Sequence, residues 1–163
     1  METAILVAQL CATASLAAWL TIGVKDNILI PSLNEPYTAD VMAMVEMEKE
    51  YPEAHAHVAH RAITNRTVQR TAFYIVVSME LLATVLLWIG TIALLMALLG
   101  TATVDTARSL ALYGTTAFTA VWSGMLIVGN HFNYWFSHEG AQNTHYQMTL
   151  WGIGTSILIV AGS

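Results

Sequence analysis

Long apolar stretches alternate with shorter polar ones along the chain. Four windows carry at most one charged residue, and they lie at 3–24, 71–104, 109–138 and 140–163. A helix that crosses a bilayer needs about 20 consecutive, mostly apolar residues. The pattern therefore predicts an all-α, polytopic membrane protein: a single membrane domain, 1–163, built as a four-helix transmembrane bundle. The predicted spans lie at about 3–24, 71–99, 110–130 and 144–162.

One extended polar segment, at 25–70, separates the first two predicted spans. It holds five of the six basic and seven of the eleven acidic residues. Prolines punctuate it, and two short amphipathic helices fit between them. The first is predicted to begin after Thr38 as N-cap, and the second to run from Pro52 to about Asn65. We expect these helices to lie in the membrane interface or to cap the bundle.

Composition excludes several classes of protein. The chain is 56% hydrophobic and 10% charged, against roughly 25% charged in an average soluble domain. A net charge of −5 argues against nucleic-acid binding, which requires a basic face. The sequence has no glycine-rich phosphate loop, nucleophile elbow, paired-cysteine motif or dinucleotide fingerprint. Hydrolytic and nucleotide chemistry therefore lack support, and a non-catalytic protein is favoured.

Glu80 is the single charged residue inside the four windows. If the second span begins near Thr71, Glu80 lies near the middle of the bilayer, where an ionised carboxylate costs about 3 kcal/mol. We expect it to bind a proton, to face the bundle interior, or to pair with a polar group of a neighbouring helix. A structural tie is favoured, and a proton relay, ligand contact or quinone contact is the alternative.

Histidines gather at two places, the segment 130–147 and the polar segment 25–70. Three histidines and a carboxylate suffice for a metal site, but the segment 130–147 has no pair of ligands spaced to lie on adjacent helical turns. In the polar segment, His57 and His60 would face one way on the second short helix. If the first and third loops lie on the same side of the membrane, the two groups can meet. Solvated or hydrogen-bonded interfacial histidines are favoured, no cofactor is predicted, and a metal ion, haem or quinone is the alternative. The candidate ligands are His131, His138, Glu139, His145, His55, His57 and His60.

Aromatic and basic residues at the ends of the predicted spans suit the membrane–water boundary. We interpret them as interfacial anchors or contacts; they are Tyr134, Trp135, Arg61 and Arg108. The basic residues near span ends favour a cytoplasmic first loop.

The chain also resembles the bacterial family of predicted small integral membrane proteins of unknown function. The matching features are Glu50-Tyr51-Pro52, His60-Arg61-Ala62-Ile63-Thr64, Tyr74, Glu80, Arg108-Ser109-Leu110-Ala111-Leu112, Val128-Gly129, Gly140 and Gln142. The resemblance implies four membrane helices, a large first loop, both termini inside and no assigned activity. Its orientation is opposite to the one that the basic residues favour, and we favour the orientation of the family because the first loop is also rich in acidic residues. Glu80 matches the family pattern, whereas most of the histidines do not.

These observations favour a small accessory subunit that packs against a larger bacterial membrane complex, respiratory or photosynthetic. The expected location is the bacterial inner membrane, cytoplasmic or intracytoplasmic, with the lipid bilayer and the larger complex as partners. A membrane redox protein that binds a metal or quinone through Glu80 and the segment 131–145 is the alternative. An oligomeric transporter is a weaker one, because four spans offer little wall for a pore.

Overall fold

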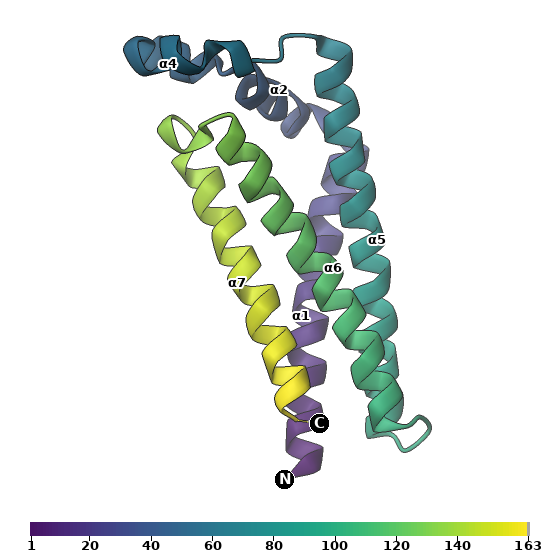
Figure 1. The fold of residues 1–163 in the computed structure, drawn as a ribbon. Coiled ribbons are helices and arrows are strands. Elements are labelled where there is room, and N and C mark those ends of the chain that lie inside the picture. Colours follow the sequence, from purple (N-terminus) through teal and green to yellow (C-terminus); the bar gives the residue numbers. More distant parts are fainter. Residues whose placement is uncertain (163) are drawn as a thin grey trace.

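The computed structural model describes residues 1–162 and arranges them as an all-α fold, which confirms the predicted fold class. Four long helices lie side by side (Figure 1). They are α1 (Glu2–Leu29), α5 (Arg66–Leu98), α6 (Val104–His131) and α7 (Glu139–Ala161). Within the described residues, α1, α5 and α6 are long and apolar enough to cross a membrane. The first part of α7 is polar, so its role as a fourth span stays a prediction.

Both chain ends lie at one end of the bundle, together with the α5–α6 turn (Figure 1). The opposite end carries the short helices of the first loop and the α6–α7 turn. We refer to these as the terminal end and the loop end. Because α1 and α5, and α6 and α7, are joined at the loop end, the first and third loops lie on the same side of the bundle, as the sequence analysis required for them to meet.

The first loop folds as three short helices with 3₁₀ turns on either side. The helices are α2 (Glu35–Ala43), α3 (Val45–Glu50) and α4 (Pro52–Val58), and the turns are Pro31–Leu33 and Ala59–Arg61. The structure therefore differs from the two predicted helices. The first begins earlier than Thr38, because Pro36 occupies its first turn. It then breaks at Met44, whose backbone is left-handed with φ 56°.

The helix that begins at Pro52 ends at Val58, well before the predicted limit near Asn65. Asn65 instead caps α5, since its side-chain oxygen accepts hydrogen bonds from the backbone N–H groups of Thr67 and Val68. An N-cap residue has non-helical backbone angles. The chain therefore leaves the 3₁₀ turn in an extended conformation before it enters α5.

Small residues set the close packing of α5 against α6. A Cβ atom at Gly90 would lie 2.5 Å from Cα of Ala111, and one at Gly114 would lie 2.8 Å from Cα of Leu87. Glycine permits this approach because it has no side chain, as is common where membrane helices pack. The core on either side of these contacts is closed by fully buried side chains that include Leu16, Leu20, Leu94 and Phe118.

The first loop packs directly on the α6–α7 turn. Met42, Met44 and Met47 form a buried cluster with Phe132, which follows the last residue of α6. Methionine fills irregular gaps well because its side chain is unbranched and flexible. The backbone N–H of Ile63 also donates to the carbonyl of Met42 at 2.8 Å. The short helices thus form a cap over the loop end rather than a separate unit.

Candidate functional site

Glu80 lies inside the bundle and has a polar partner on a neighbouring helix. Its side chain is 5% exposed, and its Oε2 accepts a hydrogen bond of 3.0 Å from Nδ2 of Asn27 on α1. Asn34, which precedes α2, donates in turn to Oδ1 of Asn27 at 2.7 Å. A chain of side-chain hydrogen bonds therefore runs from the first loop through α1 to α5. The partner is of the kind that the sequence analysis favoured, an amide from a neighbouring helix.

The level of Glu80 in the bundle differs from the sequence-based expectation. Asn27 lies in the last turn of α1. Glu80 therefore lies level with the loop end of α1, not with its middle. The expectation assumed that α5 begins near Thr71, whereas this helix begins at Arg66. Its 33 residues correspond to about 50 Å of helix, which exceeds a hydrocarbon core of ~30 Å, so part of α5 extends beyond such a core.

A second polar contact lies at the terminal end and joins three helices. Nε of Arg108 donates to Oε1 of Gln9 at 3.2 Å. Nε2 of Gln9 donates to the carbonyl oxygens of Leu158 and Ile159 at 3.1 and 3.2 Å. Gln9 is completely buried and Arg108 is 7% exposed. Arg108, predicted to be an interfacial contact, is thus part of the buried core, and its Nη2 has no hydrogen-bond partner within the described residues.

Sequence analysis missed Gln9 as the partner of Arg108. The available signal was a polar residue among apolar ones within the first predicted span. Its partner lies 99 positions away in the sequence. Only the packing of α1 into the bundle, against α5 and α7, brings the two side chains together.

The histidines of the α6–α7 turn have separate partners. Nδ1 of His145 lies 3.3 Å from the hydroxyl of Tyr134, and the two rings stack with centroids 5.8 Å apart. The ring of His138 packs edge-on against Tyr37 of α2 at 4.9 Å. His131 is exposed and lies against Phe132. The three histidines therefore have different aromatic partners, and His145, which lies in α7, also packs against Trp122 of α6 with centroids 5.5 Å apart.

Two of the predicted anchors in this turn differ in their surroundings. Trp135 is 42% exposed and stacks on Phe136, as suits an interfacial residue. Tyr134 is only 4% exposed. Its ring lies against Gly129, where a Cβ atom would meet the ring at 2.7 Å. Tyr134 is therefore a packing residue of the turn, not a surface anchor.

At the loop end, burial shifts the pKa of several groups, among them His138 and Tyr134. It lowers the pKa of His138, and the carboxylates of Asp40, Glu46 and Glu50 oppose that shift. Burial raises the pKa of the Tyr134 phenol to about 12. Both groups are therefore neutral at pH 7.

The segment that carries the first-loop histidines contacts the third loop through other residues. Arg61 donates to the carbonyl of His131 at 3.3 Å, and Tyr51 packs on Phe136 at 5.1 Å. The histidines themselves lie on α4 and the following turn; they are His55, His57 and His60. Glu139 is the exposed first residue of α7. Among residues 1–162, no group of three or more His, Cys, Asp or Glu side chains is arranged to hold a metal ion.

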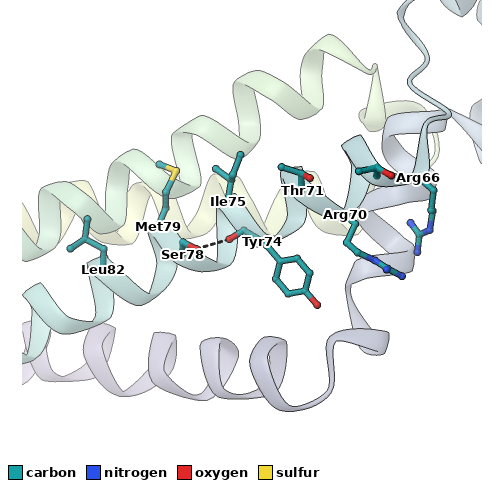
Figure 2. A pocket seen from close by; sticks show the side chains of 9 residues that line it. Arg66, Arg70, Thr71, Tyr74, Ile75, Ser78, Met79 and Leu82 are labelled. Carbon is teal, nitrogen blue, oxygen red and sulfur yellow. Dashed lines mark hydrogen bonds between the residues drawn. The ribbon is translucent and has the colours of Figure 1, made fainter.

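An open groove of about 690 Å³ runs along the outer surface of α5 near the loop end. Figure 2 shows Arg66, Arg70 and Tyr74 on one side of the groove, with Ile75 and Met79 on the other. Its remaining lining residues are Thr67, Thr71, Ser78 and Leu82. The groove is polar and basic toward the start of α5 and apolar further along. Sequence analysis grouped the two arginines only as part of the charge of the first loop.

Comparison with known proteins identifies the family. The family model described as "Predicted small integral membrane protein (DUF2165)" matches residues 5–161, almost the whole chain. No curated protein and no solved structure matches the chain significantly. The match agrees with the apolar helices of the structure and with the resemblance noted from the sequence. This chain is therefore an integral membrane protein that belongs to the family of predicted small integral membrane proteins.

Proposed function

We propose that this protein is a small, non-catalytic accessory subunit that packs against a larger complex of the bacterial inner membrane, respiratory or photosynthetic. Hydrogen bonds between buried polar side chains of different helices support the proposal. Glu80 bonds to Asn27, and Arg108 bonds to Gln9. Such contacts tie helices together, which suits a scaffold.

One face of α1 carries the proposal, because it is exposed and consists of small side chains. We call it the small-residue face; its members are Ala4, Ala8, Cys11, Ser15 and Ala18, all exposed. They recur every three or four residues, which aligns them along one side of a helix. The opposite side of α1 packs into the bundle through Leu16, Ala17 and Leu20. No helix within residues 1–162 covers the small-residue face.

Small side chains let a second membrane helix approach closely, and this is how helices gain packing energy in lipid. The hydroxyl of Ser15 donates to the carbonyl of Cys11 at 2.8 Å. The face therefore presents no unsatisfied hydroxyl to a partner. A helix of a larger complex can pack against it over about four turns, from Ala4 to Ala18.

The alternative functions require several functional groups, or several copies of the chain, to come together at one place. A redox or metal- or quinone-binding protein would use Glu80 with the segment 131–145, yet Glu80 bonds to Asn27 and the histidines have separate aromatic partners. A transporter would need oligomers to enclose a pore. The accessory role requires neither.

Mild detergent extraction followed by native mass spectrometry tests the proposal. We expect the chain to be recovered with larger membrane subunits in fixed stoichiometry. Elemental analysis and an optical spectrum of the same sample test the redox alternative. A lone chain or homo-oligomer that carries a metal, haem or quinone would contradict the accessory role and make Glu80, His131, His138 and His145 the residues to mutate.

A matched pair of variants tests the surface itself. Ala8→Leu adds bulk to the small-residue face, and Ala120→Leu makes the same change at an exposed position of α6. We expect Ala8→Leu to reduce co-purified subunits about tenfold, equivalent to ~1.4 kcal/mol of association, and Ala120→Leu to leave them unchanged. Equal recovery from both variants would rule out this face as the contact. Cys11, the single cysteine of the chain, also allows a photo-crosslinker to be attached within the face.

A further inference from the structure

The groove on α5 has an order of side chains that follows the depth of a lipid leaflet. All nine lining residues come from α5 and all are exposed. Arg66 and Arg70 lie at the loop end, the phenol of Tyr74 follows, and Ile75, Met79 and Leu82 continue toward the middle of the bundle (Figure 2). Charge, an amphipathic ring and then aliphatic groups form the sequence that a phospholipid meets between its phosphate and its acyl chains.

The basic end of the groove carries one uncompensated positive charge. Glu35 of α2 is 8% exposed and forms ion pairs with both arginines, with Arg66 through Nη2 and with Arg70 through Nε at 3.9 Å. One carboxylate therefore serves two guanidinium groups. Arg66 also donates to Gln69 at 3.3 Å. The Arg70 guanidinium makes no hydrogen bond within residues 1–162, and its side chain is 63% exposed.

Distances along α5 agree with the thickness of a leaflet. Arg70 lies one helical turn, about 6 Å, beyond Tyr74. Tyrosine rings settle at the boundary between hydrocarbon and headgroups, so Arg70 reaches the level of the phosphates. From Tyr74 to Leu82 the helix rises about 12 Å, close to the ~15 Å depth of one hydrocarbon leaflet.

We propose that this groove binds one anionic phospholipid, with its phosphate on Arg70 and Arg66 and an acyl chain between the rows of side chains that follow. A guanidinium offers two parallel donors to phosphate oxygens, which makes it well suited to this contact. The hydroxyls of Thr67 and Thr71 can bond to an uncharged headgroup such as glycerol. No acidic residue lines the groove to receive a choline or ethanolamine cation. This site is independent of the proposed accessory role, because it lies on α5 and not on α1.

Native mass spectrometry of the full chain tests the site with two lipids of equal chain length, phosphatidylglycerol and phosphatidylcholine. We expect the unmodified protein to retain phosphatidylglycerol about tenfold better. Arg70→Gln removes the charge and should abolish that preference. Arg70→Lys keeps the charge but not the forked geometry, and should restore part of it. The thermal midpoint of each variant without added lipid shows whether it is folded.

Lys49→Gln is the matched control, because Lys49 is an exposed cation of the same loop that pairs with Glu46 outside the groove. It should leave the lipid preference intact. Equal loss in Lys49→Gln and Arg70→Gln would mean general electrostatic attraction and would overturn the site. Displacement of the lipid by millimolar inorganic phosphate would also overturn it, because the groove would then bind a free anion. Equal retention of both lipids by the unmodified protein would have the same consequence.

Discussion

Asn27, in the last turn of α1, donates a 3.0 Å hydrogen bond to the carboxylate of Glu80 on α5. The contact joins the helices that precede and follow the first loop. Asn34 extends it into that loop. The three side chains therefore tie the end of α1 and the start of the first loop to α5, which gives Glu80 a structural role.

Replacing Asn27 by Leu should destabilise the fold. The change removes the side-chain donor to a buried carboxylate, so we expect a loss of about 1–3 kcal/mol in the free energy of unfolding. Unfolding in detergent micelles measures it. Ser78→Ala is the control, because Ser78 is exposed and donates only to the carbonyl of Tyr74 on its own helix. Unchanged stability of Asn27→Leu would show that the contact does not hold α1 to α5.

Breaking the contact between Gln9 and Arg108 should cost more than removing both partners. Gln9→Leu leaves the buried guanidinium of Arg108 without its side-chain acceptor. We expect this single change to destabilise by about 3–5 kcal/mol, and the double change to Gln9→Leu and Arg108→Leu to recover part of that loss. A double-mutant cycle of unfolding free energies measures the coupling. Strict additivity would argue that the two side chains do not depend on each other.

Adding a methyl group where α5 meets α6 should separate the two helices. Gly90→Ala and Gly114→Ala place a Cβ atom within 2.8 Å of backbone on the other helix. We expect each to destabilise by about 1–3 kcal/mol through overpacking. Gly124→Ala is the matched control, since no atom lies within 4 Å of its added Cβ. It should be neutral or stabilising by up to ~1 kcal/mol, because alanine favours a helix.

Lowering the pH below about 6.5 should reduce the free energy of unfolding, and His138 should contribute to that loss. The folded state lowers the pKa of this histidine, whereas the unfolded chain binds a proton near pH 6.5. Between these two pKa values the unfolded state holds more protons, so acid favours unfolding. Denaturation at pH 7.5 and pH 5 should show a smaller decline for His138→Gln than for the unmodified protein.

The control for this pH dependence is His57→Gln, since His57 is exposed on α4. That variant should keep the full decline of the unmodified protein. If both variants show the same decline, His138 does not contribute to the acid sensitivity. Asp40, Glu46 and Glu50 oppose the shift at His138, so neutralising any one of them should steepen the decline.

The sequence by itself determined the long helices and the character of their surroundings. Charge-free windows of about 20 or more residues admit few other structures in lipid, because every backbone polar group must be bonded within the segment. The same windows made Glu80 stand out, and the alternating direction of consecutive spans put the first and third loops on the same side. The family resemblance followed from residues spread over almost the whole chain, and the family match over 5–161 confirms it.

Only the tertiary structure decided which polar residues meet. The pairs Gln9–Arg108 and Asn27–Glu80 are separated by 99 and 53 positions. Their contact depends on the rotation and register of α1 against the other long helices, which the packing of buried side chains between these helices sets. The burial of Tyr134 against Gly129 and the break at Met44 are likewise features of the loop end, where the cap and the α6–α7 turn pack on the bundle. The hydrophobic pattern of the sequence determines which segments are apolar enough to form helices in lipid. The packing of side chains between those helices determines which of their faces are in contact.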